Sequence, residues 1–314
     1  MSFTTLSEIL PKVEGSYEKF SELSNKTWFG VGGPAEVLFS PADTDDLSYF
    51  LKEVDKKIPI MILGLGSNLL VRDGGIPGVT IKLGQAFSFI DIKDDIEIRC
   101  GAGISCPAVS SKAQKNGISG MEFLTGIPGS IGGAIRMNAG AYGEDIQKIL
   151  KSVDLLDSDG NFFRLKVDDL DFQYRSCNVP KKWVFVSACF KGELKNKDLI
   201  KEKMRKIRTE RLSSQPIKSR TSGSTFINPS NVRAWELIDK AGCRGLNFGN
   251  ASVSEHHCNF LVNNGNASAE EIENLGEEIR KRVFENSGIQ LSWEIIRVGV
   301  NISDFNSLLT EGVS

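Results

Sequence analysis

Histidine is scarce in this chain of 314 residues: only His256 and His257 are present, and they are adjacent. A metal site with several histidine ligands is therefore nearly excluded, and we expect no metal. A Ser-His-Asp triad is possible on paper. We expect the chemistry to depend instead on a bound cofactor or on Ser, Tyr, Glu, Lys and Arg side chains.

Several targeting and binding signals are also missing. No basic start precedes an apolar run at the N-terminus, and no apolar stretch is long enough to span a bilayer. The six cysteines are scattered without a C-x-x-C pair, so we expect reduced thiols, mostly in cores. The net charge of −2 gives no general attraction to nucleic acid or acidic membranes. We therefore expect a cytoplasmic protein that binds neither.

Apolar runs, glycine turns and charged stretches predict three regions, 1–84, 85–200 and 201–314, with α+β content. The first contains a helix capped by Asp43 or Thr44 between strands. The second combines strands, a helix ending at Gly117 and a hairpin turn at 158–161, before a charged helix.

The third region contains helices within 235–243 and 268–288 and strands at 257–263 and 289–299. Ser268 and Glu271 form a capping box, and Gly288 ends that helix. In the closing strand, alternation places Glu294 on the face opposite Trp293 and Ile295.

Two glycine-rich segments carry the first chemical signals. GLGSNLLV, Gly64–Val71, follows an apolar strand and can present successive N–H groups to phosphate oxygens. A Rossmann reading fails because Leu69 stands where the third glycine belongs. GIPGSIGGAIRMNAGAYG, 126–143, suggests a long ligand lying along bare main chain. Tight helix–strand packing is the alternative interpretation of that stretch.

Three further segments indicate no particular function when each is considered alone. TSGSTFINP contains Ser224, YRSCN contains Tyr174 and Arg175, and LSWEIIRVG contains Glu294. An isolated serine is usually a cap or a turn former. Together and in this order, however, the segments are specific.

The chain resembles the UDP-N-acetylenolpyruvoylglucosamine reductase (MurB) family over roughly residues 20–300. The resemblance rests on NKTWFGVGGPAE, LGLGSNLLVRDGGIPGVTIKLG, GMEFLTGIPGSIGGAIRMNAGAYG, YRSCN, RTERLSSQP, SGSTFINP, AWELIDKAGCRG, HHCNFLVNNGNA and WEIIRVG. It is closer to the shorter form of the family, which lacks an extra tyrosine-bearing loop.

The resemblance implies a two-part FAD-binding region of the vanillyl-alcohol-oxidase (PCMH-type) kind, formed by 1–84 and 85–200, and a C-terminal α+β substrate domain, 201–314. It implies noncovalent FAD, although linkage through Cys106 is left open. The implied FAD-binding residues are Gly64, Gly66, Ser67, Asn68 and Leu69 at the phosphates, and Thr125, Gly126, Gly129, Ser130, Gly132, Gly133, Asn138 and Ala139 beside the flavin.

The implied reaction belongs to peptidoglycan synthesis, and so to cell-wall biogenesis, cell shape and division. NADPH reduces the flavin, and flavin N5 then gives a hydride to UDP-N-acetylglucosamine enolpyruvate, forming UDP-N-acetylmuramate. Ser224 matches the proton donor, and Arg175 and Glu294 match the pair that polarises the substrate carboxylate. Tyr174 and Asn228 match substrate-binding positions. The resemblance also implies that the protein is a monomer.

The sequence departs from the family pattern at three positions. Ile227 replaces a lysine, for which Lys218 or Arg220 could substitute. Arg297 stands three residues after Glu294 where the pattern has an arginine two after, which points it to the other face of a strand. Cys177 replaces a commoner serine.

Three alternatives remain beside this interpretation: another FAD oxidoreductase of the same fold, a flavin-binding protein without turnover, and an NAD-dependent Rossmann dehydrogenase. Ser224, Arg175 and Glu294 together favour the reductase. At most one of His256 and His257 is expected to face the site.

Overall fold

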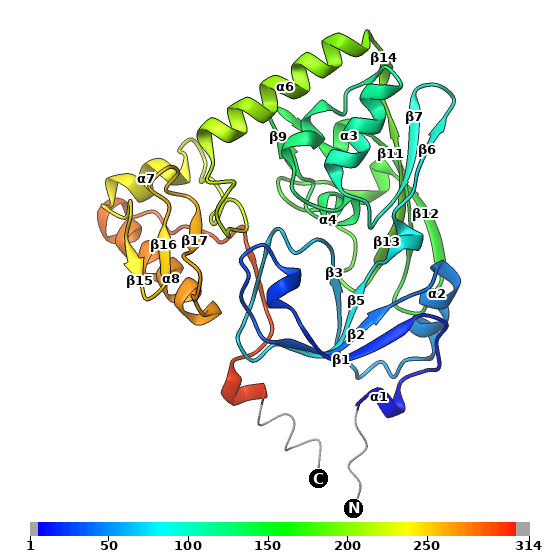
Figure 1. Ribbon diagram of the computed structural model, residues 1–314, viewed down its shortest axis with the longest axis horizontal. Helices are drawn as coiled ribbons and strands as arrows, with labels where there is room; N and C mark the ends of the chain where they lie inside the picture. The colour runs from blue at the N-terminus through cyan, green and yellow to red at the C-terminus, as the bar shows by residue number, and fades with distance from the viewer. Residues whose placement is uncertain (1–5, 306–314) are drawn as a thin grey trace, which may run out of the picture.

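The first region is built on a four-stranded sheet. In the computed structural model, which describes residues 6–305, the strand order is β1-β2-β5-β3, with β1 antiparallel to β2 and the other neighbours parallel (Figure 1). Helix α2 begins beside Asp43, whose side chain accepts the N–H of Asp46, which confirms the predicted cap. The elements are α1 (Leu6–Ile9), β1 (Ser16–Glu22), η1 (Ser24–Lys26), β2 (Pro34–Ser40), α2 (Thr44–Glu53), β3 (Ile60–Leu63), β4 (Leu69–Val71) and β5 (Ile76–Lys82).

The second region has a five-stranded antiparallel sheet in the order β12-β11-β13-β7-β6. The predicted hairpin joins β11 to β12, and Asp157 accepts the N–H groups of Asp159 and Asn161 within its turn. The strands of this sheet are β6 (Ile90–Lys93), β7 (Glu97–Gly101), β11 (Leu150–Leu156), β12 (Phe162–Lys166) and β13 (Val184–Lys191). Shorter strands are β8 (Ile118–Ser119), β9 (Gly140–Ala141), β10 (Glu144–Asp145) and β14 (Glu193–Leu194).

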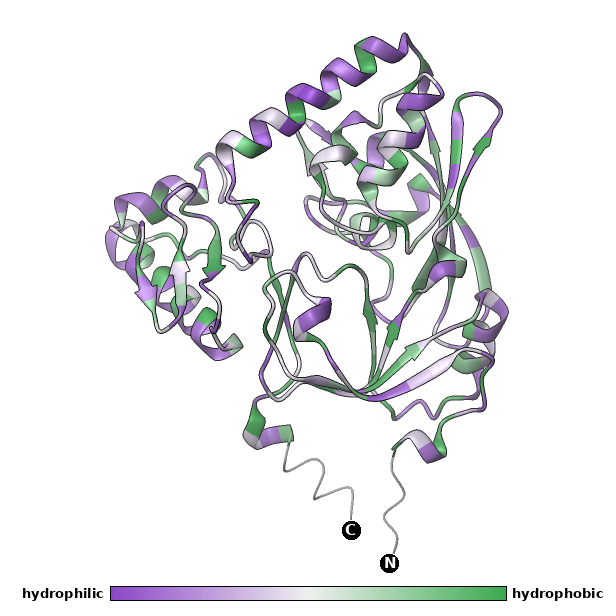
Figure 2. Cartoon of the chain, viewed as in Figure 1, coloured by the Kyte–Doolittle hydropathy of each residue, from purple (hydrophilic) through white to green (hydrophobic). Residues whose placement is uncertain are grey.

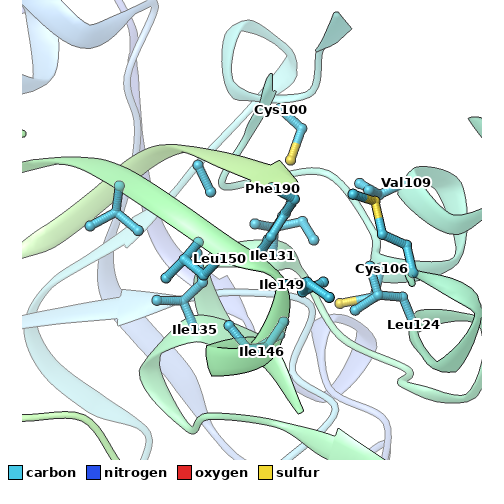
Figure 3. Packing of buried hydrophobic residues seen from close by; sticks show 14 of the residues in the cluster. Cys100, Cys106, Val109, Leu124, Ile131, Ile135, Ile146, Ile149, Leu150 and Phe190 are labelled. Carbon is cyan, nitrogen blue, oxygen red and sulfur yellow. The ribbon is translucent and has the colours of Figure 1, made fainter. Parts of the chain in front are cut away.

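Short helices pack on this sheet and enclose its core. Figure 3 shows Ile131 and Ile135 of α4 among the same buried side chains as Phe190 of β13. Four of the six cysteines are buried, so most of the thiols lie in cores as predicted. The helices are η2 (Gln85–Phe87), α3 (Cys106–Lys115), η3 (Glu122–Gly126), α4 (Ile131–Arg136), α5 (Ile146–Ile149) and η4 (Val167–Leu170), and α3 ends before Gly117 as predicted.

Helix α6 (Lys197–Ser214) is the charged connector that the sequence predicted. Figure 2 shows it as mainly hydrophilic, with separate hydrophobic residues along its length. Its buried residues Ile200, Met204 and Ile207 pack toward η3 and α3 of the second region. The boundary expected at residue 200 therefore falls inside a helix that belongs, by packing, to the second region. No helix within residues 6–305 is both long and apolar enough to cross a membrane.

The third region packs a small sheet, β15-β16-β17, against α8. Helix α8 begins with the predicted capping box of Ser268 and Glu271 and ends at Gly288, whose φ is 71°. The elements are α7 (Ala234–Lys240), β15 (Asn247–Phe248), β16 (Ala251–Val253), β17 (Leu261–Asn263), α8 (Ala269–Ser287) and β18 (Ile296–Val298).

The strand predicted at 289–299 is largely wrong. Only Ile296–Val298 forms a strand, β18, and it pairs in parallel with β4 of the first region. Before it, the chain has no regular strand and forms an isolated bridge between Trp293 and Phe226. Its apolar side chains are still buried on one side, because Leu291 and Ile295 enter the core of the third region. The strand predicted at 257–263 likewise shortens to β17.

Candidate functional site

A cleft of about 690 Å³ is lined by residues from all three regions. The turn after β3 forms one wall, and the glycine-rich segment leading into α4 forms the second. The C-terminal end of α6, the loop around Ser224 and the segment at Glu294 complete it. Both glycine-rich segments, and the three segments that contain Ser224, Arg175 and Glu294, therefore contribute to a single site.

The two glycine segments approach each other closely. A Cβ on Gly64 would lie 2.6 Å from Ser130 Oγ, and one on Gly129 would lie 3.3 Å from Ser67 Oγ. Gly66 adopts a φ of 66°, a conformation that glycine takes without steric cost. Both glycine-rich segments line the cleft, and their few side chains leave main-chain N–H groups accessible to a flat or phosphorylated ligand.

Helix α4 starts at this wall, where Ser130 Oγ accepts the N–H of Gly133. Gly132 serves a different purpose, because a Cβ there would meet the Cβ of Ala102 at 3.1 Å. Tight packing, one of the two interpretations of this stretch, therefore accounts for Gly132, and ligand contact stays a prediction for the glycines that line the cleft.

Ten of the thirteen residues expected at the FAD line the cleft. They are Gly64, Gly66, Ser67, Asn68, Leu69, Gly126, Gly129, Ser130, Gly133 and Ala139. Thr125, Gly132 and Asn138 are not among the lining residues, and Thr125 and Asn138 are buried. Asn138 is buried and donates to the carbonyl of Gln173, and Thr125 Oγ1 accepts from Arg208. In this structure these three support the wall.

Cys106, the one position left open for a covalent link, does not line the cleft. It lies in the hydrophobic core near Leu124 and Ile149 (Figure 3). Burial raises the pKa of its thiol to about 12. A thiol in these surroundings is almost fully protonated at neutral pH and is a poor nucleophile.

Arg175 and Glu294 meet in the cleft as an ion pair, with 3.2 Å between Arg175 Nε and Glu294 Oε1. Their side chains are 23% and 15% exposed. Burial raises the pKa of Glu294, and the charge of Arg175 opposes that rise. Arg175 also has a φ of 60°, an uncommon backbone conformation of the kind found where function fixes a side chain.

A backbone hydrogen bond holds the loop that carries Ser224 next to the segment that carries Glu294. The N–H of Glu294 donates to the carbonyl of Thr225 at 2.8 Å, so the residue after Ser224 is joined to the carboxylate residue. Asn259 fixes the loop from the other side, because its side chain bonds both the N–H and the carbonyl of Phe226. Asn68 donates from its side-chain amide to the carbonyl of Glu294, which joins the glycine turn after β3 to the segment that carries Glu294.

Of the two residues expected to bind substrate, Asn228 lines the cleft and Tyr174 does not. Asn228 lines the cleft, and its side chain caps α7 by accepting the N–H of Ala234. Tyr174 is 62% exposed and does not line the cleft, although its ring lies 5.0 Å from the Arg175 guanidinium. The structure therefore brings Asn228 to the site and leaves Tyr174 at its margin.

Neither proposed substitute for the missing lysine reaches the cleft. Lys218 and Arg220 do not line it, and Arg220 instead donates to the carbonyl of Gly265. Arg233, at the start of α7 beside the Asn228 cap, lines the cleft instead. It was missed because Arg233 lies in the turn between Asn228 and α7, where the Asn228 side chain bonds the N–H of Ala234, and no periodic pattern marks that position.

Other lining residues that sequence reasoning missed come from α6 and from the third region. They include Arg211, Ser214, Gln215, Trp235 and Asn259. His257 lines the cleft and His256 does not, which confirms that at most one of them faces the site. Burial lowers the pKa of His257, which favours the neutral imidazole.

Arg297 lies away from the cleft and belongs to a network with α8. Its guanidinium pairs with Glu273 and Glu277 and stacks over the ring of Trp293 at 4.6 Å. It therefore fixes the residue before Glu294 without reaching the cleft itself.

Two domain families match the chain. Residues 35–166 match the FAD binding domain, and residues 215–298 match the C-terminal domain of UDP-N-acetylenolpyruvoylglucosamine reductase. Proteins named UDP-N-acetylenolpyruvoylglucosamine reductase are similar over nearly the whole length. One from Rickettsia bellii is 50% identical over 290 residues, covering 92% of this chain and 96% of the relative. One from Anaplasma marginale is 48% identical over 302 residues, covering 96% and 100%. The chain belongs to the UDP-N-acetylenolpyruvoylglucosamine reductase family.

A solved structure agrees with this assignment. The MurB crystal structure from Thermus caldophilus has a TM-score of 0.80 and 31% identity, covering 92% of this chain and 100% of that one. The predicted family, the FAD-binding domain and the α+β fold with a C-terminal MurB domain are thereby confirmed. The protein is an oxidoreductase of the MurB family, and the glycine-lined cleft lies in part within its FAD-binding domain.

Proposed function

We propose that this MurB-family protein uses NADPH to reduce UDP-N-acetylglucosamine enolpyruvate to UDP-N-acetylmuramate, a step of peptidoglycan synthesis. The observation that carries the proposal is the convergence of Ser224, Arg175 and Glu294 beside a main-chain-lined cleft. We expect the protein to act as a monomer in the cytoplasm.

The cleft fits noncovalent FAD. The positions where a Cβ would approach the opposing wall, Gly64 and Gly129, are glycines. Main-chain N–H groups in such turns suit a pyrophosphate. The turn from Gly64 to Leu69 would bind the phosphates, and the segment from Gly126 to Ala139 would bound the flavin. When bound, FAD accepts a hydride from NADPH and supplies it to the enolpyruvyl double bond.

Arg175 and Glu294 prepare the substrate for that transfer. Arg175 supplies positive charge to the enolpyruvyl carboxylate. Glu294, whose pKa is raised by burial, donates a hydrogen bond in its neutral form, and an approaching carboxylate favours that form further. Both interactions strengthen as negative charge develops on the carboxylate during reduction, so they stabilise the transition state more than the ground state.

Ser224 completes the reaction by protonating the carbon next to the carboxylate. Hydride addition at the terminal carbon leaves an electron pair at the neighbouring carbon, and the Ser224 hydroxyl gives its proton to that pair. A serine hydroxyl is a weak acid, but a carbanion is a strong enough base to take its proton. Asn228 and Arg233 would bind the diphosphate at the other end of the substrate.

The proposal is tested by assaying FAD-loaded protein with NADPH and the enolpyruvyl substrate. NADPH oxidation that depends on the substrate, with a product two mass units heavier, supports it. NADPH oxidation that is indifferent to this substrate would point to the alternative, a flavin oxidoreductase of the same fold with another acceptor.

A further inference from the structure

Arg175 is carried by a tight turn whose two ends are joined by backbone hydrogen bonds. The N–H of Gln173 donates to the carbonyl of Ser176 at 3.0 Å, and the N–H of Ser176 donates to the carbonyl of Gln173 at 3.2 Å. Gln173, Tyr174 and Ser176 are exposed, so the turn buries little of its own surface. The direction in which Arg175 points therefore depends on contacts from outside the turn.

Asn138 supplies such a contact. Its buried side chain donates from Nδ2 to the carbonyl of Gln173 at 3.3 Å, and its Oδ1 accepts the N–H of Gln147 at 3.1 Å. The bond to Gln147 fixes the plane of the amide, and the other end of the amide is thereby directed at the turn. Asn138 has a φ of 40°, in the left-handed region that asparagine adopts more readily than most residues.

The chain directly after Asn138 lies beside the Arg175 guanidinium. A Cβ on Gly140 would be 3.4 Å from Arg175 Nη1, so the glycine lets the arginine lie next to the main chain of β9. Ala139, Gly140 and Ala141 also line the cleft. One short segment thus borders the cleft, bonds the turn and lies next to the guanidinium.

We propose that Asn138 is a positioning residue for Arg175, because it holds the turn from Gln173 to Ser176 so that the guanidinium faces Glu294 and the enolpyruvyl carboxylate. The inference rests on the proposed function, which assigns carboxylate binding to Arg175. Asn138 does not line the cleft, so it acts through the turn and does not touch the substrate. A guanidinium binds a carboxylate through directed N–H groups, and a small displacement of the turn weakens that interaction.

Two variants remove the Nδ2 donor and suit the backbone conformation at this position. Asn138→Gly deletes the side chain, and Asn138→Asp keeps an acceptor for the N–H of Gln147. In stopped-flow measurements on FAD-loaded protein, both should slow flavin reoxidation by the enolpyruvyl substrate by roughly ten- to a hundredfold, and they should slow flavin reduction by NADPH less. The matched control is Asn116→Gly, which removes a side-chain bond to the carbonyl of Lys112 away from the cleft and should behave as wild type.

Two further readouts separate positioning from a general structural role. In an Arg175→Ala background, Asn138→Gly should cause little additional loss of reoxidation, because no guanidinium is left to misplace. Hydrogen exchange, measured without substrate, should be roughly three- to tenfold faster at the amides of Gln173 and Ser176 in Asn138→Gly and unchanged in β11.

Unchanged reoxidation in both Asn138 variants, or a full additional loss in the Arg175→Ala background, overturns the inference and leaves the proposed function in place. Equal losses in both half-reactions together with a lowered melting temperature give Asn138 a structural role and also overturn it. Unchanged exchange at the turn overturns it without reference to any substrate. Wild-type protein whose reduced flavin is not reoxidised by the enolpyruvyl substrate contradicts the proposed function, and the inference with it.

Discussion

Glu294 shows how a single residue acquires its chemistry from its surroundings. Its sequence context is an ordinary apolar segment, yet in the fold its carboxyl is mostly buried and faces Arg175. Desolvation favours the neutral acid and the arginine favours the carboxylate, and desolvation has the larger effect because the pKa is raised. The residue therefore keeps its proton, and with it a hydrogen-bond donor, to higher pH than an exposed glutamate does.

This raised pKa predicts a pH dependence. The folded protein keeps the Glu294 proton above the usual value of 4.5, where the unfolded chain has lost it, so this group's contribution to stability falls as pH rises from there through the folded pKa. Oxidation of the reduced flavin by the enolpyruvyl substrate should slow over the upper part of that range. Glu294→Gln, which stays neutral, should remove this limb of the pH profile in stopped-flow measurements. A limb that persists unchanged would contradict the assigned role.

Ser224 is predicted to matter for only one half of the reaction. Ser224→Ala should leave flavin reduction by NADPH nearly intact and slow reoxidation by the substrate by roughly 10²- to 10⁴-fold, because protonation belongs to the second step. Rapid-mixing absorbance measures both steps separately. Ser230→Ala, an exposed serine farther along the same segment, is the matched control. Equal losses in both steps would remove Ser224 from the proton-donor role.

The limits of sequence reasoning are visible at this scale. Ser224, Arg175 and Glu294 were identified only through their ordered resemblance to a family, because none has a local signature. Gly132 is predicted to lie at the flavin, and the structure adds a packing contact that the sequence did not show, because a Cβ there would meet Ala102. Arg211 was missed because its place in the cleft depends on how α6 packs, and a helical pattern alone does not specify that.

Among the elements, β4 and β18 join the first region to the third. They pair in parallel, and Arg72, directly after β4, makes two hydrogen bonds of 2.9 Å with Glu273 of α8. Asp73 accepts the N–H groups of Ala269 and Glu270 and so caps the same helix. These contacts orient the segment that carries Glu294.

The Arg72–Glu273 pair is predicted to stabilise this junction. Because Arg72 is about one-third exposed, screening limits the expected coupling to about 1 kcal/mol. The measurement is a double-mutant cycle of Arg72→Ala and Glu273→Ala by urea unfolding. The exposed Glu202–Lys206 pair of α6 serves as the control and should show no measurable coupling. A coupling at Arg72–Glu273 no larger than in the control would contradict this prediction.

Elements with local signals were predicted well, and elements defined by distant partners were not. The cap at Asp43, the capping box at Ser268 and the stop at Gly288 lie within one helical turn of the residues they affect. The closing strand depends on β4, which is far away in the sequence, and on a loop near Ser224. Hydrophobic alternation gave the buried face of 289–295 correctly but could not show that most of it lacks a strand partner.

For the whole molecule, the central feature is a cleft that no single region forms. The first region supplies a glycine turn, the second supplies a glycine-rich wall and α6, and the third supplies Ser224 and Glu294. The cleft is thus lined by residues of both the FAD-binding domain and the C-terminal domain of the family. The resemblance predicted this assembly, and the sequence alone could not have shown its geometry.

The measurement that tests this account most directly is the visible absorption spectrum of FAD-loaded protein under anaerobic conditions. NADPH should bleach the flavin, and only UDP-N-acetylglucosamine enolpyruvate should restore its colour. A bleached flavin that ignores this substrate would contradict the proposed reaction while leaving the FAD site in place. Protein that binds no FAD at all would mean that the facing glycine segments pack only against each other.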